Sequence, residues 1–234
     1  MPSLRRSVGK AIHQYHMIES GDRIAVGVSG GKDSLFLLRL LSLRRRWVPI
    51  DYEVVAIHID LGFDSTGERL EPYLRLQGIP YHIEKTEIGL VAHSEANREN
   101  PCFLCARLRR KRLFELADAM GCAKIALAHH RDDIVETLLI NMFYGGEIGT
   151  MVPHQRLFQG RLSIIRPLAL TEEDAIRRYT EAHGFPVIGS GCPTAGNSRR
   201  SRVKSLLAEL ARKDKRIKGN IFRSMGNIRK EYLP

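Results

Sequence analysis

Short apolar runs alternate along the chain with longer segments in which apolar residues recur at helical spacing. The runs are rich in β-branched residues and lack strict alternation, which is typical of strands buried on both faces. They lie at residues 24–28, 54–59, 79–83, 124–128 and 162–165. Helical periodicity marks residues 4–18, 35–46, 68–77, 105–120, 132–144 and 171–184. This order predicts an α/β fold with a doubly wound parallel sheet of about five strands.

Two further segments are less regular. Residues 86–100 predict a short helix followed by a loop, and residues 149–160 predict a loop. Thr171 suits the N-cap of the helix that follows it, because a hydroxyl can accept from the first amides of a helix. The composition changes near Gly189, and we predict three parts: a basic N-terminal helix at 1–22, a central domain at 23–188 and a basic C-terminal segment at 189–234.

The positive charge is concentrated at the C-terminal end. Of the formal net charge of +11, the chain from Arg199 onward has twelve basic and three acidic residues, a net +9. Val203, Leu206, Leu207 and Leu210 recur there at helical spacing, so we expect this segment to be at least partly helical. So much positive charge favours a polyanionic partner, and RNA fits better than free ATP.

Length and composition limit the class of protein. The 234 residues suffice for one α/β domain with a small appendage. The apolar stretches are shorter than the ~20 residues that a membrane helix needs, and the N-terminal residues lack the apolar centre of a secretory signal. Four cysteines are too few for a disulfide scaffold, so we expect a reduced, cytoplasmic protein that acts away from membranes.

Between the first strand and the first long helix after it lies a turn suited to phosphate. Its sequence is Ser29-Gly30-Gly31-Lys32-Asp33-Ser34, directly after Val28. Glycines let backbone N–H groups approach an anion, and the N-terminal end of a helix adds positive potential. Lys32 supplies a charge, and the two serines supply hydroxyl donors. The spacing matches neither the common nucleoside-triphosphate loop nor the dinucleotide fingerprint.

The turn instead resembles the PP-loop of the ATP pyrophosphatase superfamily. That resemblance implies cleavage of ATP between its α and β phosphates, with AMP transferred to a substrate oxygen and pyrophosphate released. Lys32 would then act at the phosphates, as one of the catalytic residues.

Three cysteines form the second group of candidate functional residues. Cys102 and Cys105 are separated by two residues just before a predicted helix, and Cys192 lies far along the chain. Two thiolates at this spacing can hold one metal centre. The residues leave three alternatives open: a structural zinc with Cys122 or a histidine as the fourth ligand, a redox or sulfur-carrying pair, or an iron–sulfur cluster with one iron open to a substrate atom. For Cys122 itself, a small buried apolar role is expected.

A wider resemblance covers nearly the whole chain, from Arg5 to about Leu210. Its matching stretches are Pro101-Cys-Phe-Leu-Cys-Ala-Arg-Leu-Arg-Arg110, Lys124-Ile-Ala-Leu-Ala-His-His-Arg-Asp-Asp133, Asn141-Met-Phe-Tyr-Gly-Gly146 and Ile165-Arg-Pro-Leu168. They resemble the tRNA 2-thiocytidine synthetase (TtcA) family. The resemblance implies a [4Fe–4S] cluster on Cys102, Cys105 and Cys192. That family often has a second Cys-x-x-Cys at the last site, whereas here the earlier position is Gly189.

The resemblance also assigns an ATP site at the carboxyl ends of the strands, where ligands bind in doubly wound sheets. Its expected residues are Val28, Ser29, Gly30, Gly31, Lys32, Asp33, Ser34, His58, Asp60, Ala128, His129 and Asp132. Asp33 and Asp132 would act through Mg²⁺, because bare carboxylates repel a triphosphate. For Asp132 and Asp133, helix capping is the alternative.

Arg109 is the remaining catalytic candidate, beside Lys32 and Asp132. Related cluster-dependent thiolases have a lysine at this position. An arginine there could stabilise developing charge, although it stays protonated and cannot act as a base.

The family implies a tRNA thiolase that adenylates C2 of the cytidine at position 32 of the anticodon loop and replaces its oxygen with sulfur. Its implied partners are tRNA, a sulfur donor (a cysteine desulfurase or free sulfide) and a second copy in a homodimer. The alternatives are the same chemistry on another tRNA base or a small heterocycle, and a non-catalytic protein that binds nucleotide, cluster and RNA.

Overall fold

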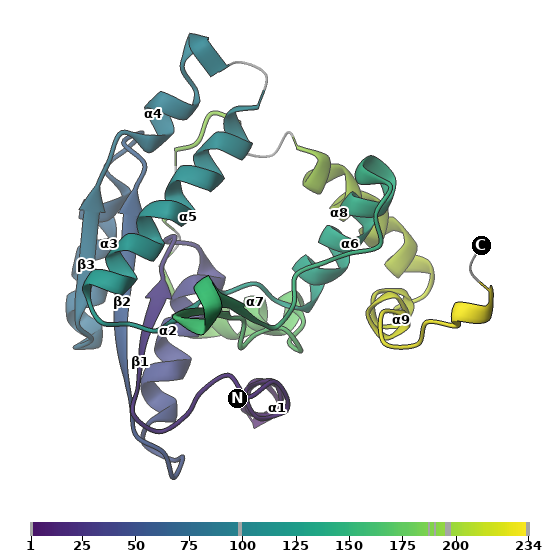
Figure 1. The fold of residues 1–234 in the computed structure, drawn as a ribbon, viewed down its shortest axis with the longest axis horizontal. Coiled ribbons are helices and arrows are strands. Elements are labelled where there is room, and N and C mark those ends of the chain that lie inside the picture. The colour runs from purple at the N-terminus through teal and green to yellow at the C-terminus, as the bar shows by residue number, and fades with distance from the viewer. Residues whose placement is uncertain (1, 98–99, 187, 190, 195–197, 233–234) are drawn as a thin grey trace.

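The computed structural model describes residues 2–97, 100–186, 188–189, 191–194 and 198–232. Its sheet has the strand order β3-β2-β1-β4-β6-β5, and every pairing is parallel except that of β5 with β6. The strands are β1 (Asp22–Gly27), β2 (Tyr52–Asp60), β3 (Tyr81–Lys85), β4 (Lys124–Ala126), β5 (His154–Leu157) and β6 (Leu162–Ile165). The predicted α/β class and its five parallel strands are confirmed (Figure 1).

The α-helices of the described residues are α1 (Pro2–Gln14), α2 (Lys32–Arg44), α3 (Thr66–Gln77), α4 (Ile88–Ala92), α5 (Pro101–Ala119), α6 (Arg131–Gly145), α7 (Glu173–Ala182), α8 (Arg199–Lys213) and α9 (Ile217–Ser224). Short 3-10 turns are η1 (Glu95–Asn97), η2 (Phe158–Gly160) and η3 (Lys230–Tyr232). Within the described residues, no helix combines the length and apolar character that a membrane span requires.

The two faces of the sheet have separate hydrophobic cores, as expected when successive side chains of a strand point in opposite directions. Ile24 and Val26 of β1 pack with apolar residues of α1, α2, α3 and α7. Ala25 packs on the other face with Leu113 and Leu116 of α5. Cys122 joins this second core at 2% exposure, so its predicted buried apolar role is confirmed.

A third apolar cluster lies beyond the sheet. Val203 and Leu207 of α8 pack on Val135 of α6, and residues of α9 pack against them. Figure 1 shows α8 and α9, in yellow-green and yellow, beside α6 and away from β1–β3. The predicted helical character of the basic segment is therefore confirmed. The three-part division at 1–22, 23–188 and 189–234 stays a prediction.

Some element predictions were wrong. Residues 154–157 form β5, an antiparallel edge strand, within the segment predicted as a loop. The first helix ends at Gln14 instead of residue 18, because His16 adopts a positive φ of 48°. Thr171 is not the N-cap of α7, a position that Glu172 takes. The Thr171 hydroxyl instead pairs with that of Ser7 at 2.9 Å, so tertiary contact outweighed the local capping preference.

The core under α2 permits a direct test of the fold. Phe36 is 1% exposed, and its ring meets that of Tyr179 edge-on with centroids 5.2 Å apart. We expect Phe36→Ala to lower the free energy of unfolding by about 3–5 kcal/mol, through lost burial and a residual cavity. Urea denaturation checks this value. Leu76→Ala is the matched control: Leu76 is 82% exposed, so its loss should change stability by no more than about 0.5 kcal/mol. Equal effects of the two substitutions would contradict the packing described here.

Candidate active site

The turn between β1 and α2 is held by its own serine side chains. The Ser34 hydroxyl donates to the carbonyl of Gly31 at 2.8 Å and accepts from the amide of Ser29 at 3.1 Å. Gly30 has φ +85°, a conformation that favours glycine. Gly31 is the N-cap of α2, and no side chain caps it. Amides at an uncapped helix start can donate to an anion, so the turn has the geometry of a phosphate site.

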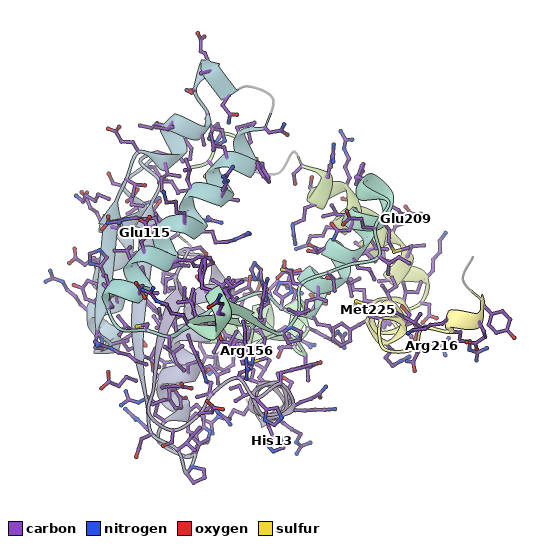
Figure 2. All side chains as sticks on the ribbon, viewed as in Figure 1. His13, Glu115, Arg156, Glu209, Arg216 and Met225 are labelled. Carbon is purple, nitrogen blue, oxygen red and sulfur yellow. The ribbon has the colours of Figure 1, made fainter. Side chains whose placement is uncertain are left out.

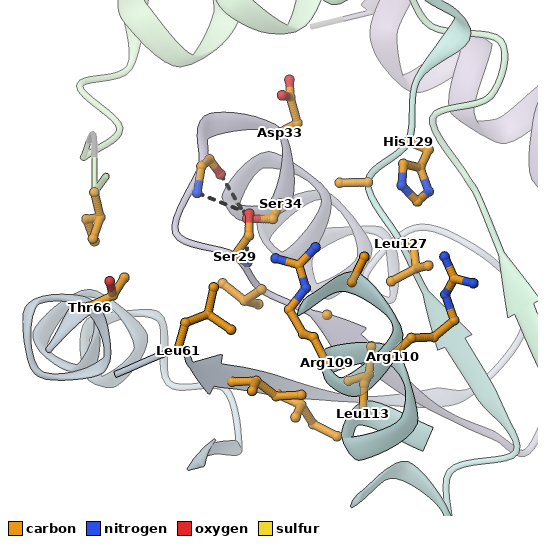
Figure 3. A pocket seen from close by; sticks show the side chains of 18 of the residues that line it. Ser29, Asp33, Ser34, Leu61, Thr66, Arg109, Arg110, Leu113, Leu127 and His129 are labelled. Carbon is orange, nitrogen blue, oxygen red and sulfur yellow. Dashed lines mark hydrogen bonds between the residues drawn. The ribbon is translucent and has the colours of Figure 1, made fainter. Parts of the chain in front are cut away.

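A pocket of about 570 Å³ lies beside this turn (Figure 3). Predicted ATP-site residues that line it are Val28, Ser29, Gly31, Asp33, Ser34, Ala128 and His129, together with the predicted catalytic residue Arg109. Its apolar lining residues are Ile57, Ile59, Leu61, Leu113 and Leu127. Figure 3 shows the Arg109 side chain extending from α5 toward the Ser29–Ser34 turn. The pocket thus combines apolar surface with anion-binding groups.

Other predicted ATP-site residues lie behind the pocket wall. Asp60 is 5% exposed and accepts from the amides of Gly62 and Gly67 at 3.0 and 2.7 Å, so its carboxylate is engaged in shaping the loop after β2. The His58 Nδ1 lies 2.8 Å from the carbonyl of Val28, and its Nε2 is buried with no hydrogen-bond partner among the described residues. Burial is the main cause that lowers the pKa of His58. Neither residue lines the pocket.

Lys32 is held beside the turn by two carboxylates. Its Nζ lies 3.0 Å from Asp33 Oδ2 and 3.1 Å from Glu173 Oε1 on α7. Burial works against the charged form, but the two carboxylates outweigh it and raise the pKa of Lys32. The other oxygen of Asp33, Oδ1, is buried with no partner among the described residues. A buried oxygen of this kind can bind a cation or an added donor.

Asp132 is buried next to this group, at 5% exposure. It accepts from Lys218 Nζ of α9 at 2.8 Å and from the amide of Glu173 at 2.9 Å. Burial alone would raise its pKa, but these donors outweigh burial and keep the pKa of Asp132 below its ordinary value. Asp132 does not line the pocket, whereas Asp133 does. Asp133 also caps α6 together with His130, as the helix-capping alternative predicted.

His129 contributes a neutral imidazole to the pocket. Burial is the main cause that lowers its pKa to about 4, against the opposite effect of Asp133. Arg166 Nε donates to His129 Nδ1 at 3.3 Å. At neutral pH the ring therefore has its proton on Nε2.

Three residues contact the predicted site residues but were given no role in the site from the sequence. They are Glu173, Arg166 and Lys218. Glu173 connects the turn to the C-terminal segment, because it also pairs with Lys204 Nζ of α8 at 2.7 Å. Burial would raise its pKa, yet Lys204 and Lys32 together lower the pKa of Glu173 to about 2. Arg166 and Lys218 contact the predicted residues His129 and Asp132. For Glu173 the local signal was the pair of acids that opens α7, which is equally typical of a plain helix start.

Cys102 and Cys192, two of the predicted cluster ligands, lie close to the same side chain, Thr194. Pro101 starts α5 earlier than predicted, so Cys102 lies in its first turn and Cys105 begins the second. Cys102 Sγ lies 3.2 Å from the hydroxyl of Thr194, and Cys192 Sγ lies 3.4 Å from the same hydroxyl. Burial, and secondarily the charges of Cys192 and Cys102, raise the pKa of Cys105 against the opposite effect of Arg109. Three thiols from two distant segments therefore share one neighbourhood.

Two segments join the cysteines to the pocket. On α5, Arg109 follows Cys105 by four residues, about 6 Å along the helix axis and on the same face. Ile188, four residues before Cys192, lines the pocket and lies against Gly30, where an added Cβ would meet the Ile188 carbonyl at 3.1 Å. The thiols and the turn thus border one continuous region.

The same thiols can be examined as metal ligands. Among the described residues, no three His, Cys, Asp or Glu side chains are grouped tightly enough to bind a single metal ion. A mononuclear zinc needs about 2.3 Å from each sulfur to one point. A multi-iron cluster instead takes each cysteine on a different metal atom, so more widely spaced thiols suit it.

The basic residues of the C-terminal segment fall into two groups, those that form ion pairs with the central domain and those that face solvent. Arg200, Lys204 and Lys218 pair with carboxylates of α6 and α7 beside the turn. Other cations are exposed: Arg202, Arg212, Lys213, Lys215, Arg216, Arg223, Arg229 and Lys230. Figure 2 shows Arg216 and Met225 toward the outer end of this segment, away from the sheet. Part of the charge thus anchors the segment, and the rest forms a basic surface.

Comparison with known proteins agrees with this geometry. The model of the PP-loop domain family matches residues 3–210. The tRNA-cytidine(32) 2-sulfurtransferase of Geobacter sulfurreducens is 40% identical over 234 residues, covering 98% of this chain and 91% of that protein. That of Geotalea daltonii is 41% identical and covers 98% and 93%.

Among solved structures, the U34-tRNA thiolase NcsA from Methanococcus maripaludis, solved with its [4Fe-4S] cluster, has a TM-score of 0.81. The match covers 100% of this chain and 79% of that chain at 24% identity, which shows a shared fold.

The fold and the turn define a PP-loop protein, of the ATP pyrophosphatase type. Within that class, the chain belongs to the family of tRNA-cytidine(32) 2-sulfurtransferases, and it is an enzyme. The resemblance inferred from the sequence is thereby confirmed. The individual roles of the site residues, the sulfur donor and the homodimer stay predictions.

Proposed function

We propose that this enzyme converts the cytidine at position 32 of tRNA to 2-thiocytidine, using ATP and a [4Fe–4S] cluster. The observation that supports this most is the continuity between the phosphate-binding turn and the three thiols, through α5 and the segment around Ile188. The relatives' names support the substrate and position. In this proposal the central domain at 23–188 uses ATP, and the basic parts at 1–22 and 189–234 hold tRNA.

The first half-reaction is transfer of AMP. The cytidine O2 attacks the α-phosphorus, the bond to the β-phosphate oxygen breaks, and pyrophosphate leaves. The amides of the turn and the Ser29 and Ser34 hydroxyls would bind the phosphates, while Lys32 and Arg109 would offset the developing negative charge. Asp33, with its unpartnered oxygen, and Asp132 would hold Mg²⁺ on the phosphates. The apolar part of the pocket suits the adenine ring, with Ala128, His129 and the residues after β2 around it.

The second half-reaction exchanges oxygen for sulfur. A C–S bond forms at C2, the C2–O bond breaks, and AMP leaves with the former cytidine oxygen. Cys102, Cys105 and Cys192 would hold the cluster, which supplies an iron centre able to carry sulfur. The sulfur itself would come from a cysteine desulfurase or free sulfide, in the reducing cytoplasm that such thiolates need. The position of Arg109 between thiols and turn suits stabilisation of the leaving AMP.

Reconstitution of the purified enzyme tests this function. Unmodified tRNA, Mg²⁺-ATP and sulfide are supplied anaerobically, and the digested tRNA is analysed by mass spectrometry. We expect one 2-thiocytidine per tRNA at position 32, with AMP and pyrophosphate released in equal amounts. A tRNA with uridine at position 32 is the matched control and should remain unmodified. Thiolation at another base, or AMP release without any thiolated product, would contradict the proposal.

A further inference from the structure

One hydroxyl group contacts two of the three cysteines. Thr194 Oγ1 lies 3.2 Å from Cys102 Sγ and 3.4 Å from Cys192 Sγ, although these cysteines are ninety positions apart in the chain. It also lies 3.2 Å from Nε2 of His93, whose Nε2 in turn is 3.9 Å from Cys192 Sγ. Nothing in the mechanism above uses Thr194 or His93.

The hydrogen-bond roles in this group follow from its chemistry. His93 Nδ1 lies 2.9 Å from the carbonyl oxygen of Gly89, which only accepts, so Nδ1 has the proton and a neutral His93 presents Nε2 as an acceptor. The ring is also packed edge-on against Phe63, with centroids 5.3 Å apart. Its orientation is therefore fixed from two sides. The Thr194 hydroxyl can both donate a hydrogen bond and accept one, so it can donate to His93 Nε2.

Ligation of the cysteines changes what they can do. A thiol can donate through S–H, but a cysteine that binds metal has lost its proton and only accepts. The Thr194 hydroxyl has one proton, and both sulfurs and His93 Nε2 would then compete for it. A hydrogen bond to a charged acceptor is roughly twice as strong as one between neutral groups, which favours the sulfur. His93 is partly exposed, so water can satisfy its Nε2.

We propose that Thr194 is a positioning residue of the cluster site, whose hydroxyl donates a hydrogen bond to the sulfur of Cys102 or Cys192 when these bind iron. The inference rests on the proposed function, because it assumes the cluster. Hydrogen bonds to ligand sulfurs stabilise the more negative, reduced form of a cluster and raise its reduction potential. Such outer contacts also contribute to metal affinity.

Thr194→Val and Thr194→Ser test this proposal as a matched pair. Valine keeps the branched shape and removes the hydroxyl, whereas serine keeps the hydroxyl. After anaerobic reconstitution, a redox titration followed by electron paramagnetic resonance measures the potential, and loss of visible absorbance with a chelator measures cluster release. We expect the Val variant to have a more negative potential and about tenfold faster release, with the Ser variant close to the unsubstituted enzyme.

The outcomes separate this proposal from the function itself. If the unsubstituted enzyme takes up a cluster and the Val variant matches it in potential and in release, the role of Thr194 is overturned and the function stands. If both variants change equally, the effect comes from the backbone of this segment and the hydroxyl role is also overturned. If the unsubstituted enzyme takes up no iron, both proposals are wrong. Circular dichroism of both variants confirms that the fold is kept.

Discussion

Cys102→Ser and Cys192→Ser enzymes are expected to lose bound iron and sulfide and to lose thiolation to background, while still binding ATP. A serine hydroxyl is not deprotonated near neutral pH and is a poor ligand for iron, whereas a cysteine thiolate is a good one. Both cysteines lie outside the hydrophobic cores: Cys102 is exposed and Cys192 is half-buried. The fold and the phosphate turn should therefore survive either change. Iron analysis, visible absorption and ATP binding measured on the same samples check all three parts.

Cys122→Ala is the matched control for these two variants. Cys122 is a free cysteine as well, but it lies in the core beside α5 and away from the other three. Its replacement should leave iron content and thiolation unchanged, at a modest cost in stability. An iron content that survives Cys192→Ser would show that the distant segment supplies no ligand. Recovery of zinc in place of iron from the unsubstituted enzyme would favour the structural alternative that the cysteine spacing alone left open.

The parallel core was predictable because burial on both faces leaves a strong local trace. The inner parallel strands are largely apolar and buried, whereas β3 at the sheet edge is mostly polar and half-buried. The helices between the strands repeat apolar residues at helical spacing. The phosphate turn was equally local, since Gly30, Gly31 and the serines are adjacent in the sequence. Its position between a strand and a helix could be inferred from the flanking pattern. For such elements, local sequence and tertiary structure favour the same conformation.

Elements determined by distant contacts had no comparable signal. β5 consists of His154-Gln155-Arg156-Leu157, mostly polar, and becomes a strand because its backbone pairs with β6 at the sheet edge. The ion pairs of Lys204 and Lys218 with Glu173 and Asp132 join residues 31 and 86 positions apart. The convergence of Cys192 on Cys102 was implied only by family resemblance. Spacing alone could not show that α5 and the Ile188–Cys192 segment approach each other.

Lys32→Met is expected to reduce AMP and pyrophosphate release roughly 10²–10³-fold, the usual cost of removing one group that stabilises charge in a transition state. Lys32 stays protonated because Asp33 and Glu173 outweigh burial and raise its pKa. Methionine keeps the length of the side chain and removes the charge. Release of labelled pyrophosphate in the presence of tRNA measures the effect, and ATP affinity measured separately shows how much of it arises in the ground state.

Lys204→Met is the control that separates an effect of the Lys32 charge on phosphate from an effect of the ion pairs with Glu173. Lys204 contacts the same carboxylate, Glu173, at 2.7 Å, but reaches it from α8. Its replacement therefore removes an equal charge from the same partner without changing the turn. If Lys32 acts on phosphate, the Lys204 variant should keep AMP release within about threefold, because Lys204 reaches Glu173 from an exposed position on α8 and Lys32 still pairs with that carboxylate. If both variants lose AMP release equally, the loss comes from removing a cation that pairs with Glu173. Lys32 would then stabilise this ion-pair network and would have no catalytic role.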